Sequence, residues 1–143
     1  METVALFSKS PHLLEILNQF LISRKLLCSC FDQSESFEKF LAETRAFPDL
    51  IVLDCESPDC VNNILSATNN FQNKINETHN QNGKKLNLKQ IITKNIYLLI
   101  LVDKTKFKTF QSFQGNLEIF TLLKPFLYKD LESIYDQIVA TSK

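Results

Sequence analysis

The sequence has few of the residues on which many catalytic and ligand-binding sites depend. It contains only two histidines and two glycines among 143 residues. Two histidines leave little material for a Ser-His-Asp or Cys-His arrangement, so hydrolytic catalysis is not expected. The lack of glycine argues against a loop that cradles a phosphate with its backbone N–H groups. We therefore expect that this protein is not an enzyme.

An excess of one charge and long apolar runs are missing as well. Lysine plus arginine and aspartate plus glutamate number 16 each, and this balance argues against a nucleic-acid partner, which would favour a strongly basic surface. No apolar run approaches the roughly 20 residues of a transmembrane helix. The N-terminus does not resemble a signal peptide. We expect a cytoplasmic protein without a membrane partner.

The four cysteines do not form a recognisable metal site. They are Cys28, Cys30, Cys55 and Cys60, and they lack the tight CxxC spacing and the well-placed histidines of a zinc site. Cys28 and Cys30 are two residues apart, so on a strand they lie on the same face. We interpret the cysteines as buried thiols that act as small apolar side chains in a reducing compartment, and we expect no metal.

Short apolar runs alternate with helical patterns along the chain. Five runs predict strands at Val4–Phe7, Leu26–Cys30, Leu50–Leu53, Ile96–Val102 and Glu118–Leu123. The third run is apolar without alternation, as expected of a parallel strand that is covered on both faces. Apolar residues recur at helical spacing between the runs and after the last one. This pattern is cleanest between Leu131 and Val139.

Local signals place the ends of the first two helices. Ser10 is a suitable N-cap for the first helix. Asp32 and Glu35 resemble a capping box for the second, and Pro48 ends it. Residues 69–95 are rich in asparagine, glutamine and lysine. We interpret this segment as a polar insertion between the third helix and the fourth strand.

This alternation predicts one α/β domain over residues 1–143, built on a doubly wound, five-stranded parallel sheet. Right-handed crossovers leave few strand orders, and we expect the flavodoxin-like or receiver-like order 2-1-3-4-5. In such sheets ligands bind at the carboxyl ends of the strands. Four segments are predicted to meet there: residues 8–10, 54–58, 102–104 and 124–125.

Three marks at these strand ends point to one family. Asp54 closes the third predicted strand, Pro58 follows four residues later, and Lys124-Pro125 closes the fifth. With these residues the sequence resembles the receiver domain of bacterial response regulators over nearly its whole length. The resemblance implies that Asp54 corresponds to the aspartate that accepts a phosphoryl group, and Lys124 to the lysine of that site. It also implies a signalling partner, such as a histidine kinase or an output protein.

Other positions depart from the family. Ser8 and Lys9 replace the acidic pair that holds Mg²⁺ after the first strand, and Val102 aligns with a threonine or serine. An aspartyl phosphate forms only when Mg²⁺ and lysine offset the charge that develops on the transferred oxygens. We expect Lys9 and Lys124 to approach Asp54 instead and to hold it ionised without a metal.

Three functions remain open. The first, which we favour, is a pseudo-receiver that signals through protein contacts without phosphorylation and needs no cofactor. The second is a working single-domain response regulator, phosphorylated on Asp54 with the help of Mg²⁺. The third is a flavodoxin-like cofactor-binding protein, in which the segment from Ser8 to Pro11 binds a phosphate at a helix N-terminus. That segment contains no glycine, which counts against the third function.

Aromatic residues gather where the fourth helix, fifth strand and fifth helix are predicted. In the family that the sequence resembles, this face meets partner proteins, and aromatic residues are enriched at interface hot spots. A row at i, i+3 and i+6 drifts around a helix, so three such rings do not all point inward easily. The candidates for a partner face are Phe107, Phe110, Phe113, Phe126 and Tyr128.

Overall fold

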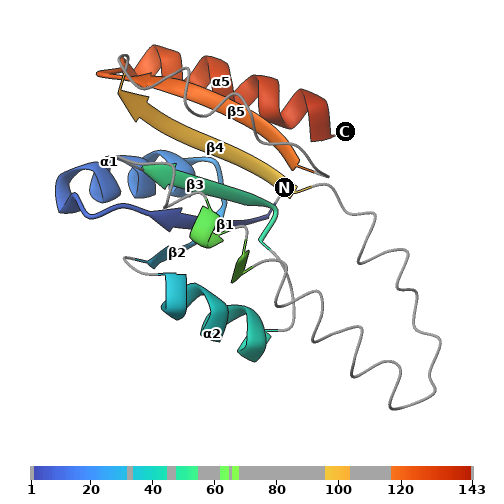
Figure 1. The fold of residues 1–143 in the computed structure, drawn as a ribbon. Coiled ribbons are helices and arrows are strands. Elements are labelled where there is room, and N and C mark those ends of the chain that lie inside the picture. The colour runs from blue at the N-terminus through green and yellow to red at the C-terminus, as the bar shows by residue number, and fades with distance from the viewer. Residues whose placement is uncertain are drawn as a thin grey trace.

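The computed structural model describes residues 2–31, 34–44, 48–54, 62–64, 66–67, 96–103 and 117–142. In chain order, and as labelled in Figure 1, the elements are β1 (Thr3–Phe7), α1 (Pro11–Ser23), β2 (Leu27–Phe31), α2 (Ser34–Thr44), β3 (Leu50–Asp54), β4 (Ile96–Asp103), β5 (Leu117–Lys124) and α5 (Tyr128–Ser142). Residues 62–64 and 66–67 are also helical. Within these described ranges, no helix is long and apolar enough to cross a membrane.

The strands form one parallel sheet with the order β2-β1-β3-β4-β5. The predicted order 2-1-3-4-5 is therefore confirmed. The arrows in Figure 1 point the same way, so the carboxyl ends of the strands lie at one edge of the sheet. The chain leaves β1 toward β2 and returns to β3 on the other side of β1. In open α/β sheets, the crevice beside such a reversal is where ligands bind.

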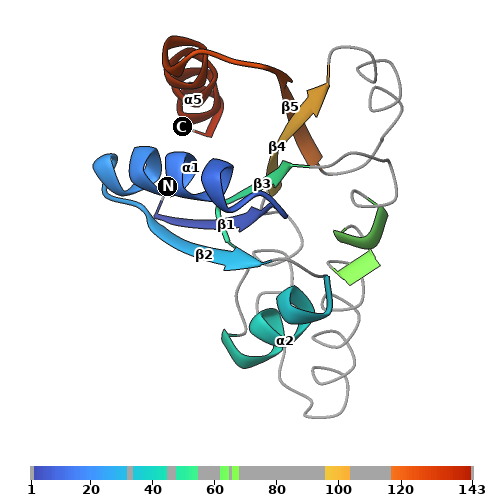
Figure 2. The ribbon, with the colours of Figure 1, turned by 90° about the vertical axis from the view of Figure 1, so that its left-hand side faces the viewer.

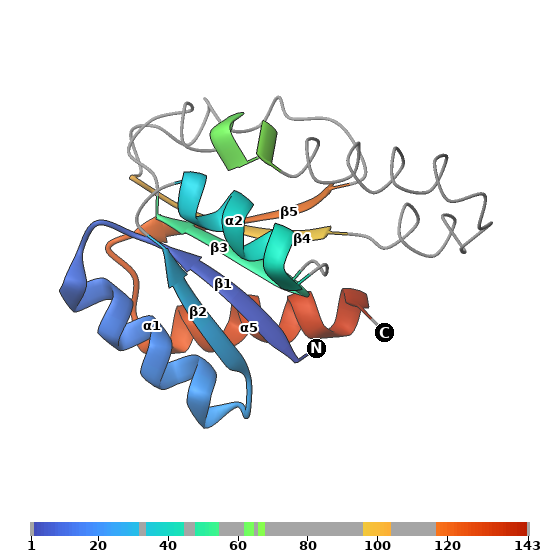
Figure 3. The ribbon, with the colours of Figure 1, turned by 90° about the horizontal axis from the view of Figure 1, so that it is seen from below.

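Helices cover both faces of the sheet (Figure 3). On one face lie α1 and α5, which contribute Phe20 and Leu131 to the core. On the other lies α2, which contributes Phe37, together with Ile64 of the short helical segment. The side chains of Leu50–Leu53 in β3 are at most 2% exposed, which explains why that strand is apolar on both faces.

The first helix begins where the sequence predicts. Ser10 is its N-cap, and the Ser10 hydroxyl oxygen accepts a hydrogen bond from the backbone N–H of Leu13 at 3.3 Å. This bond satisfies one of the N–H groups that have no partner in the first helical turn. Because the cap lies directly after Ser8 and Lys9, it also fixes the loop that follows β1.

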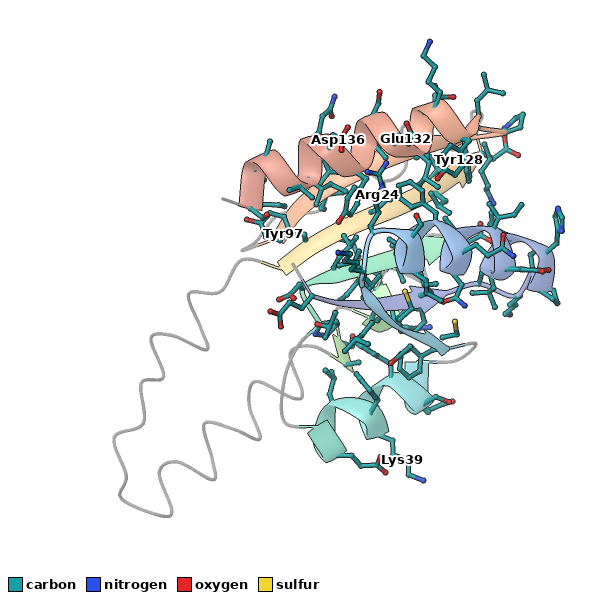
Figure 4. All side chains as sticks on the ribbon, turned by 180° about the vertical axis from the view of Figure 1, so that it is seen from behind. Arg24, Lys39, Tyr97, Tyr128, Glu132 and Asp136 are labelled. Atoms are coloured by element: carbon teal, nitrogen blue, oxygen red, sulfur yellow. The ribbon has the colours of Figure 1, made fainter. Side chains whose placement is uncertain are left out.

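Contacts of Arg24, the C-cap residue of α1, tie this helix to α5 (Figure 4). The Arg24 guanidinium lies 3.8 Å from the Glu132 carboxylate. The same group stacks on the rings of Phe20 and Tyr135, at 5.2 Å and 5.8 Å from their centroids. Phe20 also packs edge-on against Tyr128, with 5.4 Å between centroids. These contacts hold the start of α5, and the loop that leads into it, beside α1.

The observed elements differ from the prediction at their ends. The second strand is Leu27–Phe31, one residue later than predicted, and β4 and β5 extend to Asp103 and Lys124. Strand ends are the least certain part of a sequence-based assignment. An apolar run can include an unpaired residue such as Leu26, and strand pairing can continue into polar residues such as Asp103 and Lys124. The predicted capping residue Asp32 and the insertion at residues 69–95 lie outside the described residues.

The interpretation of the cysteines as buried thiols is wrong for Cys30. This side chain is exposed, whereas Cys28 is half-buried. The reason is the position of β2 at the edge of the sheet, where a strand has a neighbour on one side only. Cys55 and Cys60 lie outside the described residues.

Candidate functional site

The polar residues of the candidate site lie at the carboxyl ends of three strands. Ser8 directly follows β1, Asp54 closes β3 and Lys124 closes β5. The register pairs Phe7 with Leu53, so the next residue on each strand reaches the same edge of the sheet. The strand order thus brings together residues that are 46 and 70 positions apart in sequence.

Both carboxylate oxygens of Asp54 have a protein partner. The Ser8 hydroxyl donates a hydrogen bond to Oδ2 at 2.7 Å, and Lys124 Nζ donates to Oδ1 and forms an ion pair with it. The Ser8 oxygen in turn accepts the backbone N–H of Ser10 at 3.0 Å, which orients the hydroxyl toward Asp54. The Asp54 side chain is 11% exposed and that of Lys124 is 28% exposed. The pair is therefore better shielded from water than an ordinary surface ion pair.

The strand order also explains which side chain can reach Asp54. Because β1 is the direct neighbour of β3, the short side chain of Ser8 spans the gap. The strand β4 separates β5 from β3, and two strand spacings amount to about 9–10 Å. A long side chain such as lysine is needed to cross this distance. The peptide bond that follows it, between Lys124 and Pro125, is cis.

Lys9 does not join this arrangement. Its side chain is exposed, and the ion pair of Asp54 is made with Lys124. The chain has left β1 and bends at Lys9, so the Ser8 hydroxyl can turn to Asp54 while the Lys9 side chain lies in solvent. The structure therefore brings Ser8 and Lys124 to Asp54, where the sequence predicted Lys9 and Lys124.

Val102 presents no hydroxyl to the site. Its side chain is fully buried in the core on the α2 face of the sheet. The register places Leu101, the residue before it, beside Asp54. The apolar residue Val102 thus occupies the position that aligns with a threonine or serine in the family that the sequence resembles.

Two of the five aromatic candidates lie beside the site. Phe126 and Tyr128 line an open pocket of about 650 Å³. Tyr128 is 53% exposed and the neighbouring Leu127 is 70% exposed. The other described residues around the pocket are Leu13, Ile16, Asp103, Lys124, Pro125 and Leu131. Phe107, Phe110 and Phe113 lie outside the described residues.

The described part of the site does not fit a magnesium ion. Mg²⁺ favours an octahedral set of oxygens that includes one or two carboxylates. Over the described ranges, no group of three or more histidine, cysteine, aspartate or glutamate side chains could hold a metal. Asp54 offers one carboxylate, and its oxygens already accept hydrogen bonds from Ser8 and Lys124.

Comparisons with known proteins find similarity at the level of solved structures. No protein-family model matches the chain, and no curated protein matches it. A response regulator receiver protein from Sinorhizobium medicae matches with 14% identity and a TM-score of 0.58, over 99% of this chain and 97% of that chain. The response regulator TrrA from Thermotoga maritima, solved with Mg²⁺-BeF, matches with 15% identity and a TM-score of 0.57, over 96% and 99%.

A third match comes from a structure of histidine kinase ThkA in complex with response regulator TrrA. It has 15% identity and a TM-score of 0.53, over 97% of this chain and 99% of that chain. These matches confirm the predicted receiver fold over nearly the full length of the chain. Because the identities are low, the chemistry of the site has to be argued from its own residues.

Two features of the site were not predicted from the sequence. The first is the direct hydrogen bond from Ser8 to Asp54. The predicted strand order already made the first and third strands neighbours, so it could have indicated that a residue after the first strand reaches Asp54. The second is the wall that α1 contributes to the pocket through Leu13 and Ile16. Leu13 belongs to the apolar stripe of its helix, and a stripe does not reveal which of its residues remain accessible.

Proposed function

We propose that this chain is a pseudo-receiver, a cytoplasmic module of two-component-type signalling that acts through protein contacts and without Mg²⁺-dependent phosphorylation. The observation that carries this proposal is the pairing of both Asp54 oxygens, one with Ser8 and one with Lys124. In this arrangement Asp54 anchors three strand ends to one another, and each of its oxygens already accepts a hydrogen bond from the protein.

The charges around Asp54 support the proposal. A carboxylate that attacks an anionic phosphoryl donor requires cations that offset the charge on the transferred oxygens. Lys124 supplies one positive charge, which Asp54 itself balances. Ser8 supplies a neutral hydroxyl at a position where the family that the sequence resembles has an acidic residue. It therefore adds no negative charge that would attract a divalent cation.

The surface beside the site supports a role in protein contacts. Leu127 and Tyr128 are large apolar side chains that are 70% and 53% exposed, next to a pocket that is lined mainly by apolar residues. Exposed apolar patches of this kind often mark interaction sites. TrrA was solved in complex with the histidine kinase ThkA, and this supports a signalling protein as the partner, either a kinase or an output protein.

The alternative is a working response regulator that is phosphorylated on Asp54. Asp54 and Lys124 stand where the resemblance places the phosphoryl acceptor and its lysine, and they favour this function. It requires Mg²⁺ and a phosphoryl donor to displace the Ser8 hydrogen bond. The flavodoxin-like alternative has less support, because Ser8 bonds to Asp54 and Ser10 caps α1, so both hydroxyls already have protein partners.

Magnesium binding distinguishes these functions. When MgCl₂ is titrated into the ¹⁵N-labelled protein through the millimolar range, we expect no saturable shift at the amides of Ser8, Asp54 and Lys124. The physical reason is that the described residues contain no group of three or more side chains that could hold a metal ion. A parallel titration with NaCl at matched ionic strength corrects for general screening. Saturable shifts confined to these amides would favour the working response regulator.

A further inference from the structure

We propose that β2 forms an interface with a second copy of this chain, as an antiparallel strand pair that joins the two sheets across a two-fold axis. Such an interface does not depend on the function of Asp54. β2 is an edge strand, and among the described strands it pairs with β1 alone. Figure 2 shows it at the end of the sheet. The outer backbone of such a strand offers N–H and C=O groups to another strand.

The sequence of β2 lacks the usual protection of an edge strand. Edge strands are commonly shielded by charged residues, proline or bulges. Between Leu27 and Phe31, β2 has no charged residue and no proline. β5, at the opposite edge, carries Glu118 and Lys124. Leu27 is moreover 74% exposed, which makes it the most exposed of the large apolar side chains described. β2 is therefore the edge of the sheet that is suited to pairing.

The sequence of β2 is complementary to itself in one antiparallel register, centred on Ser29. In that register Ser29 faces its own counterpart, and Leu27 faces Phe31 of the second copy. Phe31 packs on the α2 face, with its ring centroid 5.2 Å from that of Phe7 and 5.2 Å from that of Phe40. Leu27 lies two and four residues before Ser29 and Phe31, so it points to the same face. Pairing thus covers an exposed leucine with an aromatic cluster on each side.

The same register brings the two cysteines of β2 together. Cys28 and Cys30 are paired with Val4 and Leu6, and both of these residues belong to the core on the α1 face. Cys28 of one copy then lies directly opposite Cys30 of the other, and the reverse pair occurs once more across the two-fold axis. Directly opposed residues have Cα atoms about 4.5–5.5 Å apart, which lies within the disulfide range of about 4.4–6.8 Å.

The charges beside β2 favour an antiparallel strand pair, and they favour a second copy of this chain as the partner of β2. Lys25, which precedes β2, is exposed and has a left-handed φ of 64°. The helix α2, which follows β2, carries the exposed Glu35 in its first turn. The antiparallel register places Lys25 of each copy beside the start of α2 of the other copy. A parallel pair would instead place Lys25 beside Lys25, and like charges in contact oppose association. A two-fold, self-complementary contact also closes into a dimer.

Disulfide trapping of the full chain tests this register. Diamide accepts two electrons and two protons from each pair of thiols that it joins. Burial raises the pKa of the Cys28 thiol, and the nearby Cys30 adds to this effect, so the reaction is run at about pH 8.5 to supply thiolate. The natural protein is expected to form a covalent dimer in which two copies of the tryptic peptide 26–39 are linked, as read by mass spectrometry.

The single variants Cys28→Ser and Cys30→Ser provide matched controls. Each alone is expected to lose the linked 26–39 peptide, because the remaining cysteine faces serine across the axis. An equimolar mixture of the two variants is expected to restore it, since Cys30 of one then faces Cys28 of the other. If Cys28→Ser alone links as efficiently as the mixture, the two strands do not pair in this register and the proposal is overturned.

Sedimentation velocity under reducing conditions tests the non-covalent dimer. The natural protein should show a concentration-dependent dimer, and Leu27→Lys should shift it to monomer without a change in the circular dichroism spectrum, because Leu27 is exposed. Leu127→Lys, at a residue that is similarly exposed and follows β5, should leave the dimer intact. A monomer at every concentration, or a Leu27→Lys protein that still dimerises, would overturn the proposal. The proposal would also be overturned if the purified protein sedimented as a complex with a different protein bound at β2 in place of a second copy of this chain.

Discussion

Replacing Lys124 by methionine is expected to lower the free energy of unfolding by about 2 kcal/mol, because the substitution leaves the Asp54 carboxylate without its charged partner. Methionine keeps most of the apolar stem of the side chain, so the loss of charge is the main change. Asp54 is 11% exposed, so water can replace the partner only in part. Lys124 is 28% exposed, and the expected loss is accordingly below the roughly 3–5 kcal/mol of a fully buried pair. Urea denaturation followed by circular dichroism measures it.

The matched control is the double variant Lys124→Met with Asp54→Asn. Asparagine has nearly the shape of aspartate, keeps an acceptor for the Ser8 hydroxyl and removes the unpaired charge. The double variant is therefore expected to be more stable than Lys124→Met alone, with a coupling energy of about 1–2 kcal/mol between the two positions. If the two substitutions prove additive, the ion pair does not contribute to stability and Asp54 is not an anchor.

Replacing Phe37 by alanine is expected to cost about 3–5 kcal/mol of folding free energy, more than the loss expected for Lys124→Met. Phe37 is fully buried. Its ring packs edge-on against Phe7 at 5.1 Å and against Phe31 at 5.6 Å. The truncation removes these contacts and leaves a cavity between α2 and the sheet. Such a loss is a large share of the total stability of about 5–15 kcal/mol of a typical domain. The midpoint of urea denaturation reports it.

Two further variants make this experiment decisive. Lys39→Ala changes an exposed residue of the same helix and should alter stability by no more than about 0.5 kcal/mol. Phe37→Leu keeps most of the apolar volume and should give an intermediate loss, which remains measurable if the alanine variant does not fold. A loss below about 1 kcal/mol for Phe37→Ala would show that α2 does not pack on this face.

The arrangement of the strands could be predicted because each strand is a separate apolar run. The segment Leu50–Leu53 is buried on both faces, as a run without alternation indicates. Once five such runs alternate with helices, the handedness of the crossovers leaves few orders to choose from. The position of Asp54 and Lys124 at the carboxyl edge follows from that order. The flavodoxin-like order 2-1-3-4-5, which was the obvious candidate among them, is the one observed.

The predictions that were wrong concern the direction of single side chains, which depends on how the strands are arranged in space. A sequence shows that Ser8 and Lys9 leave the first strand, but it does not show which of the two turns toward β3. The structure directs Ser8 inward, where its oxygen accepts the Ser10 N–H, and Lys9 outward. In the same way, the apolar composition of β2 did not reveal that Cys30 is exposed, since edge and central strands share the same residue types and differ in their neighbours.

The role of Asp54 as an anchor, in place of a phosphoryl acceptor, can be tested on the intact protein. Its mass is measured after incubation with Mg²⁺ and acetyl phosphate, with a receiver that accepts phosphoryl groups treated in parallel as a reagent control. We expect the mass of this protein to stay unchanged, because Ser8 and Lys124 hold the oxygens of Asp54 and the described residues provide no group of three or more ligands for Mg²⁺. A stoichiometric phosphoryl adduct that disappears in the Asp54→Asn variant would contradict the anchor role.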